Sequence, residues 1–217
     1  MEIKYLGHSS FFIKTKTAKV VTDPFDPQMV GLKFPKTEAD IVTISHSHSD
    51  HNYRAGVKEG ALFLDWPGEY EKQEVRVRGY SSFHDNKQGA DRGENILFKI
   101  EAENISVLHC GDLGHMLDDA TVELIGAVDV LIIPTGGIYT IGAEEAVKIV
   151  QEVEPSIVIP MHFGRPELNP ATFKDLAPVE TFLKAFGAKD TQTIDKLTIK
   201  KEDINPEDMH VVVLSIQ

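Results

Sequence analysis

The feature that most constrains this chain is a dense group of histidines directly after a short apolar segment. Residues 41–45 have the β-branched, apolar composition of a buried strand, and His46, His48, Asp50 and His51 follow in a His-x-His-x-Asp-His pattern. Imidazole and carboxylate are ligands for zinc, iron and manganese, and a loop at a strand end can direct several side chains toward one point. A solvent-facing polar loop is the alternative, but it does not explain so many ligand types in one short segment. The pattern therefore predicts a metal site at the end of this strand.

Two metal ions with open coordination positions need about seven ligand groups, so this loop needs partners elsewhere. The sequence offers His84, Asp112 and His162, each directly after an apolar segment. Taken alone, a histidine after a strand is often only a hydrogen-bonded polar residue, and Asp112 could be a turn residue. Their assignment as ligands depends on the need to complete the site.

Charge and composition exclude several classes of function. Twenty-two basic and 34 acidic residues give a net charge of −12, with no Lys/Arg cluster. Because nucleic-acid affinity comes largely from phosphate neutralisation, we expect no nucleic-acid partner. No apolar run approaches the roughly 20 residues that cross a bilayer, and the N-terminus has no signal layout, so we expect no membrane association and a cytoplasmic location. The single Cys110 excludes an internal disulfide and a Cys-rich zinc site, and is expected in the core.

The length and the hydrophobic pattern predict one α+β domain that spans residues 1–217. Strand-like segments dominate the first half of the chain, and strands alternate with helices in the second, which favours two packed sheets with helices outside. Predicted strands are residues 1–5, 10–14, 19–22, 41–45, 74–79, 95–100, 105–109, 128–134 and 157–160. Predicted helices are residues 121–128, 143–153 and 178–186, and predicted loops are 65–69, 85–94 and 164–175.

Taken in order, the motifs resemble those of the metallo-β-lactamase superfamily, and within it the short metal-dependent hydrolases, also called Zn-dependent hydrolases, related to L-ascorbate-6-phosphate lactonase. The resemblance covers nearly the whole chain. Its motifs are Gly7-His8-Ser9-Ser10 in the first strand, Thr22-Asp23-Pro24-Phe25, the histidine group, His84-Asp85, Gly111-Asp112, Gly136-Gly137 before Thr140, and Ile159-Pro160-Met161-His162. It implies the αββα four-layer sandwich, in which two mixed β-sheets pack face to face with helices outside and the site lies along one edge.

The resemblance also implies a ligand set for two divalent ions, with zinc as the first choice and manganese or iron as alternatives. His46, His48 and His84 would hold one ion. Asp50, His51 and His162 would hold the other, with Asp112 bridging both. Asp23 would accept a hydrogen bond that orients a ligand histidine.

Other residues are candidates for roles beside the metals. Asp50, His8 and His115 are the candidate catalytic residues, although His8 is equally well explained as a core histidine. The long polar loop after His84 suits a wall over the substrate, and its Arg92 suits contact with an anionic group. Tyr139 is a candidate pocket residue.

The function that we expect is hydrolysis of an ester, lactone or phosphodiester bond in a small-molecule substrate by a metal-bridging hydroxide. Three alternatives stay open. One is a nucleic-acid-processing nuclease of the same superfamily, against which the charge argues. Another is a di-iron oxidoreductase, whose flavin-linked relatives usually carry glutamate where this chain has His48, and no flavin domain is evident. The third is a metal-holding binding protein without turnover. The sequence leaves the oligomeric state open.

Overall fold

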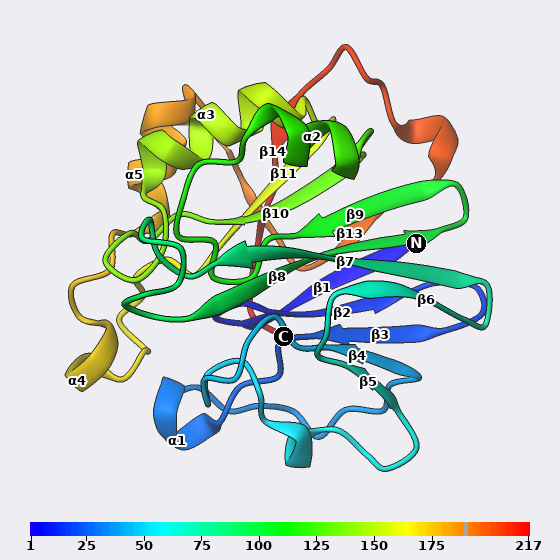
Figure 1. Ribbon diagram of the computed structural model, residues 1–217, viewed down its shortest axis with the longest axis horizontal. Helices are drawn as coiled ribbons and strands as arrows, with labels where there is room; N and C mark the ends of the chain where they lie inside the picture. The colour runs from blue at the N-terminus through cyan, green and yellow to red at the C-terminus, as the bar shows by residue number, and fades with distance from the viewer. Residues whose placement is uncertain (189–190) are drawn as a thin grey trace.

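A computed structural model describes residues 1–188 and 191–217, and its core is a pair of mixed β-sheets packed face to face (Figure 1). The six-stranded sheet has the order β13-β1-β2-β3-β4-β5, antiparallel from β13 to β3 and parallel from β3 to β5. Its strands are β1 (Glu2–Gly7), β2 (Ser10–Lys14), β3 (Lys19–Thr22), β4 (Ile41–Thr43), β5 (Leu62–Leu64) and β13 (Leu197–Thr198).

The seven-stranded sheet has the order β14-β11-β10-β9-β8-β7-β6, antiparallel from β6 to β9 and parallel from β9 to β14. Its strands are β6 (Gly68–Lys72), β7 (Val75–Phe83), β8 (Glu94–Ala102), β9 (Ile105–His109), β10 (Val130–Pro134), β11 (Ile157–Met161) and β14 (His210–Val211). A short parallel pair, β12 (Thr193–Ile194) and β15 (Val213–Leu214), lies outside both sheets.

Helices cover the outer faces of the two sheets and complete the αββα sandwich. On the seven-stranded side lie α2 (Asp119–Ile125), α3 (Ala143–Val153) and α5 (Val179–Phe186) (Figure 1). On the six-stranded side lie α1 (Pro27–Val30) and the 3₁₀ turn η1 (Arg54–Gly56), so this layer is thin; α4 (Pro170–Phe173) and η2 (Lys201–Asp203) complete the list. Among the described residues, the helices are too short or too polar to cross a membrane.

Alternation along the strands explains why the six-stranded sheet is buried on both faces. Val20 of β3 and Ile41 of β4 point into the core between the sheets, while their neighbours Val21 and Val42 point into a second apolar cluster. That second cluster joins the outer face of the sheet to Val30 of α1. The sandwich therefore rests on two apolar layers, and burial of this kind contributes roughly 25 cal/mol per Å² of apolar surface.

Most predicted elements are confirmed, with differences at their ends. Residues 10–14, 19–22 and 105–109 are strands with the predicted bounds, and the helix predicted at 143–153 is α3. The predicted strand 74–79 extends to Phe83, because β7 pairs with β8 from Arg76 to Phe83. Two predictions of loops were partly wrong: β6 begins at Gly68, inside the predicted loop 65–69, and α4 lies inside the predicted loop 164–175.

The placement of Gly7-His8 in the first strand was also partly wrong. β1 ends at Gly7, and His8 and Ser9 form the turn to β2, with His8 in the left-handed region at φ 55°. His8 therefore lies just after a strand, as do the proposed metal ligands and Asp23. His8, Asp23, the His46 loop, His84, Asp112 and His162 follow β1, β3, β4, β7, β9 and β11, respectively. Because these strands end at the same edge of the sandwich, six separate segments meet there (Figure 1).

Candidate metal centre

The loop that carries the histidine group is held in place by Asp23. The backbone N–H of Ser45 donates to Oδ1 of Asp23 at 2.7 Å, and the Ser45 hydroxyl donates to Oδ2 at 2.6 Å. Farther along the loop, the backbone N–H of Tyr53 donates to the Pro24 carbonyl at 2.7 Å, and that of Asp26 donates to the Ser49 carbonyl at 3.0 Å. The loop after β4 is thus bonded at both ends to the segment after β3.

The first group of possible ligands contains His46, His48 and His84, whose ligand atoms all lie within 4.8 Å of one another. His84 is buried, whereas His48 is exposed to solvent. The Ser45 hydroxyl gives its proton to Asp23, so it accepts from Nδ1–H of His46 at 2.9 Å, which leaves Nε2 of His46 free. The three rings come from two strand ends and form one open-sided group.

The second group contains Asp50, His51 and His162, and the same 4.8 Å limit also admits His8. All four side chains are buried. His8 Nε2 lies 3.2 Å from Oδ2 of Asp50 and forms a hydrogen bond with it. His51 Nδ1–H donates to Oδ2 of Asp23 at 2.8 Å, which turns its other nitrogen toward the interior of the site.

Asp112 lies between the two groups. Its Oδ2 is 3.2 Å from Nε2 of His84 and 3.3 Å from Nε2 of His162, and its Oδ1 is 3.2 Å from Nε2 of His51. Asn95 accepts the Asp112 backbone N–H at 2.9 Å and donates to the Cys110 carbonyl at 3.0 Å, which fixes the turn that carries the carboxylate. The carboxylate therefore reaches both groups.

The turn before Asp112 requires glycine. Gly111 has φ 54°, in the left-handed region that favours glycine. A Cβ at this position would lie 2.4 Å from Asn95 Oδ1 and 2.5 Å from the Cβ of Ser45, distances too short for any real contact. The residue thus lets Asn95, the loop after β4 and Asp112 converge.

Three residues of the centre have a backbone conformation that residues other than glycine rarely adopt. The φ angles are 55° at His8, 39° at Asp23 and 52° at His162. The backbone N–H of His162 donates to the His8 carbonyl at 3.0 Å, and the Tyr5 hydroxyl donates to the same carbonyl at 2.8 Å. Such conformations persist only where surrounding contacts enforce them, and they concentrate at functional sites.

Burial and charge set the protonation of the centre. Burial lowers the pKa of His46 to about 3 and that of His8 to about 4, so both rings are neutral at neutral pH, the form that binds metal. Burial would likewise lower the pKa of His51, but the charges of Asp112 and Asp50 outweigh it and raise that pKa well above its usual value. Burial would raise the pKa of Asp112, yet the charges of His162 and His51 hold it well below its usual range.

The polar atoms at the middle of the centre fit metal ions. Buried nitrogen and oxygen atoms in proteins almost always have a hydrogen-bond partner. Within the described part of the chain, seven side-chain atoms of the centre are buried without one: Nδ1 of His8 and His84, Nε2 of His46 and His51, both ring nitrogens of His162, and Oδ1 of Asp112. Possible ligand atoms of the centre lie within 4.8 Å of one another in groups, and the donor set of imidazole and carboxylate suits zinc, manganese or iron.

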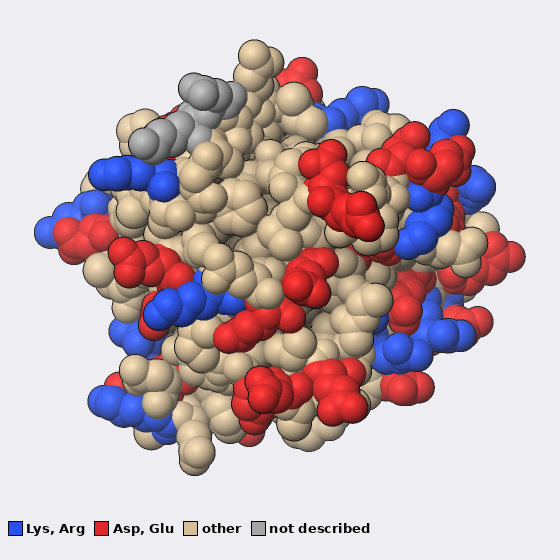
Figure 2. All heavy atoms as spheres, turned by 90° about the horizontal axis from the view of Figure 1, so that it is seen from above, with Lys and Arg blue, Asp and Glu red and all other residues tan. Residues whose placement is uncertain are grey.

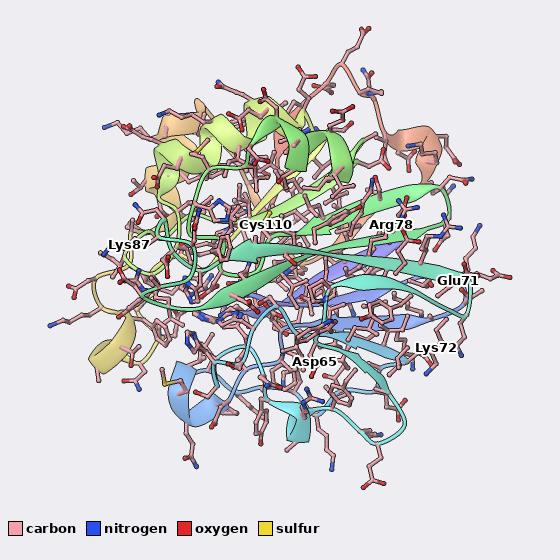
Figure 3. The ribbon with its side chains drawn as sticks, viewed as in Figure 1. Asp65, Glu71, Lys72, Arg78, Lys87 and Cys110 are labelled. Carbon is pink, nitrogen blue, oxygen red and sulfur yellow. The ribbon has the colours of Figure 1, made fainter. Side chains whose placement is uncertain are left out.

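Not every candidate catalytic residue lies at the centre. Asp50 and His8 are brought into it, but His115 is not. Nε2 of His115 accepts the backbone N–H of Phe83 at 3.1 Å, and Nδ1–H donates to the Met116 carbonyl at 2.7 Å, so both ring nitrogens are engaged by the backbone. Cys110 is fully buried in the core, as predicted (labelled in Figure 3), and burial raises the pKa of its thiol.

Two cavities open beside the metal ligands. One, of about 350 Å³, is lined by His48, His84, Asp112, His162, Arg92, Tyr139, Met29, Thr172 and Phe173 among others. The other, of about 410 Å³, is lined by His46, His48, Arg92, Trp66, Pro67, Phe83, Ser81 and Ser82 among others. Arg92 and Tyr139 thus lie in the wall, where the sequence predicts them. Met29, Phe173 and Asn95 were missed, because no local pattern marks a residue that reaches the site only through the fold.

Comparison with known proteins defines the class to which this fold and centre belong. The family model for the β-lactamase superfamily domain matches residues 2–162 of this chain. The chain is 37% identical to a structure from Thermotoga maritima, described as a Zn-dependent hydrolase of the metallo-β-lactamase superfamily, with a TM-score of 0.82 and coverage of 100% of this chain and 99% of that one. This chain therefore belongs to the metallo-β-lactamase superfamily.

More particular relatives carry the name metal-dependent hydrolase. A UPF0173 metal-dependent hydrolase from Pyrococcus abyssi is 28% identical over 209 residues, which cover 81% of this chain and 92% of the relative. The fold is shared more widely. The structure of CmlA, a diiron β-hydroxylase from Streptomyces venezuelae, matches with a TM-score of 0.66 at 13% identity, and the match covers 99% of this chain and 53% of the CmlA chain. That last likeness concerns the fold alone.

Proposed function

We propose that this protein is a metal-dependent hydrolase with two divalent ions, zinc in the first instance, that cleaves an ester, lactone or phosphodiester bond of a small molecule. The observation that carries the proposal is the convergence of seven possible ligands, among which His46, His51, His162 and Asp112 have a buried atom, Nε2 or Oδ1, without a hydrogen-bond partner in the described part of the chain. The proposed ligands of one ion are His46, His48 and His84, and those of the other are Asp50, His51 and His162, with Asp112 shared.

The bound ions would supply an activated water nucleophile and a Lewis acid for the carbonyl or phosphoryl oxygen. The protein groups keep that chemistry aligned. Asp23 holds the tautomer of His51, and through Ser45 it also orients His46. His8 holds Oδ2 of Asp50, which restricts how that carboxylate faces its ion.

The size of the cavity beside the ligands supports a small substrate. Its volume of about 350 Å³ lies within the range of roughly 300–1,000 Å³ that is usual for small-molecule sites. Its wall combines apolar groups (Met29 and Phe173) with polar ones (Tyr139 and Thr172). The net charge of −12 argues against nucleic acid as the substrate.

The exposed ligand His48 provides the cleanest test, because its removal leaves the core unchanged. Protein freed of metal with a chelator is reloaded with zinc, manganese or iron and assayed on aryl esters, lactones and bis(4-nitrophenyl) phosphate. We expect metal-dependent hydrolysis that His48→Ala lowers by orders of magnitude. The matched control is His210→Ala, which removes an exposed histidine of β14.

The test also separates the hydrolase from its alternatives. Metal binding without hydrolysis of any substrate would favour a metal-holding protein without turnover. Hydrolysis that survives the loss of His48 at full rate would contradict the proposed ligand set.

A further inference from the structure

Arg92 is unusual among the arginines of this chain. Arg54, Arg76, Arg78 and Arg165 each have a carboxylate within 4.0 Å: Asp65, Glu71, Glu69 with Glu101, and Glu167, respectively. Among the described residues, no carboxylate lies that close to Arg92. Arg92 is exposed to solvent, so its guanidinium, unlike those of the other four arginines, is open to an anion that arrives from outside.

The backbone of Arg92 is held rigidly. Its N–H donates to Oδ2 of Asp85 at 2.7 Å, and Asp85 also accepts the backbone N–H groups of Lys87, Gly89 and Asp91. The loop is closed by the N–H of His84, which donates to the Gly93 carbonyl at 3.0 Å. One buried carboxylate therefore shapes the loop after a proposed metal ligand, and it fixes the point from which the arginine side chain extends.

The guanidinium of Arg92 is held by one hydrogen bond, and its other N–H donors are not used. Nη2 donates to the Ile138 carbonyl at 3.1 Å, and the guanidinium carbon lies 5.8 Å from the centre of the Tyr139 ring. Ile138 is a β-branched residue with φ 62°, a rare conformation that directs its carbonyl. A guanidinium has five N–H donors, and the structure gives this one a single hydrogen bond. Four donors stay available in a preset position.

The position of Arg92 relates it directly to the proposed reaction. It lines the cavity of about 350 Å³ together with the proposed ligands His48, His84, Asp112 and His162. The carboxylate of Asp91 in the same wall is neutralised by Lys87 at 2.8 Å. An anionic substituent in this cavity would therefore meet the free guanidinium while its other end lies at the metal centre.

We propose that Arg92 binds a terminal oxyanion of the substrate, a carboxylate or a phosphate-type group, and that the natural substrate is an ester or lactone with such a group. This inference rests on the proposed hydrolysis for the bond that is cleaved. Guanidinium pairs with carboxylate and phosphate through two parallel hydrogen bonds, which gives both affinity and orientation. Arg92 then determines specificity without taking part in bond cleavage.

The test compares substrates that differ only at the far end. The 4-nitrophenyl esters of hexanoate, adipate and 5-phosphonopentanoate share four methylenes and end in a methyl, a carboxylate or a phosphonate. A shorter series with two methylenes, corrected for uncatalysed hydrolysis, covers a smaller spacing. We expect kcat/KM to be higher for one or both anionic esters than for the methyl ester, and Arg92→Met to lower that ratio about ten-fold or more, mainly through KM.

Arg76→Met is the matched control. It removes the same kind of side chain and the same charge, but Arg76 lies on β7 and lines neither of the two cavities beside the metal ligands. Its carboxylate partner Glu71 is labelled in Figure 3, at the end of the molecule opposite to Lys87 of the loop that carries Arg92. We expect Arg76→Met to keep the wild-type ratio. An unchanged ratio in Arg92→Met, or an equal loss in Arg76→Met, would overturn the inference.

Binding of the acids themselves separates this inference from the proposed hydrolysis. Calorimetry with metal-loaded protein compares hexanoate, adipate and 5-phosphonopentanoate, with no need for turnover. Tighter binding of an anionic acid that is lost in Arg92→Met supports the role of Arg92 even if no ester is cleaved, in which case only the proposed reaction fails. Ester cleavage and acid binding without any preference for the anionic end would support the hydrolase and overturn the inference.

Discussion

Asp23 accepts a 2.8 Å hydrogen bond from Nδ1–H of His51 deep inside the sandwich, where both side chains are fully buried. Because a proton is held on Nδ1, Nε2 is the nitrogen that faces Asp112, whose Oδ1 lies 3.2 Å away. A residue that is not itself a proposed ligand thus decides which nitrogen of His51 is offered to a metal. The same carboxylate also holds the Ser45 backbone N–H and hydroxyl.

Asp23→Asn should weaken metal binding while the protein stays folded. The amide has a donor group in place of one oxygen, so it cannot accept both the Ser45 backbone N–H and the His51 Nδ1–H, which bond to different oxygens of Asp23. Loss of such an orienting partner costs about 10–100-fold in metal affinity. Competition with a chromophoric chelator measures the change, and Asp26→Asn, which alters the nearby cap of α1, is the control. Wild-type affinity in a folded Asp23→Asn protein would contradict the orienting role.

Asp112→Asn separates a bridging carboxylate from a turn residue. The substitution keeps the size but removes the charge that would offset two dications. We expect turnover to fall by orders of magnitude and metal affinity to drop, with circular dichroism showing an intact fold. Asp118→Asn is the control, because Asp118 caps α2 at the surface and asparagine caps equally well. Full activity at normal metal content would show that Asp112 is only a turn residue.

Asp85 should make the free energy of unfolding depend on pH in the acid range. Burial would raise the pKa of Asp85, but four backbone N–H donors outweigh it and lower that pKa from 3.8 to about 2. The stabilisation is therefore complete above about pH 4 and is lost as the pH falls toward 2. In urea unfolding of metal-free protein, Asp85→Asn should lower the free energy of unfolding at pH 7, and the difference from wild type should shrink below pH 4. A difference that is independent of pH would rule out this origin.

The charge distribution predicts that the protein does not bind nucleic acid. Figure 2 shows acidic and basic side chains interspersed on the face above α2 and α3, and the described part of that face has no continuous basic patch. We expect no salt-sensitive binding to RNA or DNA at physiological ionic strength in a filter-binding assay. Sub-micromolar binding with a steep salt dependence would contradict this prediction.

The sequence predicts the histidine group well because the chemistry is local. Residue type and spacing are enough to predict ligands at His46, His48, Asp50 and His51. The other three, His84, Asp112 and His162, each follow a strand that is recognisable from its apolar residues. The sandwich brings these strand ends to one edge. The structure thus places the predicted ligands together, and their binding of metal stays a prediction.

Other parts of the site depend on long-range contacts that no local pattern carries. Phe173 belongs to a four-residue helix, which is too short to be recognised within a polar segment of the sequence. Asn95 reaches Asp112 only because β8 lies beside β9. His8 and His115 have similar local sequences next to glycine, yet one ring enters the centre and the other is engaged by backbone groups. The two-residue strands β12 to β15 are too short to give a periodic signal.

The central claim is that these seven side chains hold two metal ions, and anomalous diffraction tests it most directly. Crystals of zinc-loaded protein, measured on both sides of the zinc absorption edge, reveal the number and position of the ions. We predict two peaks, one among His46, His48 and His84 and the other beside Asp50, His51 and His162, with Asp112 between them. A single peak would contradict the shared role of Asp112, and no peak within this group would contradict the metal centre itself.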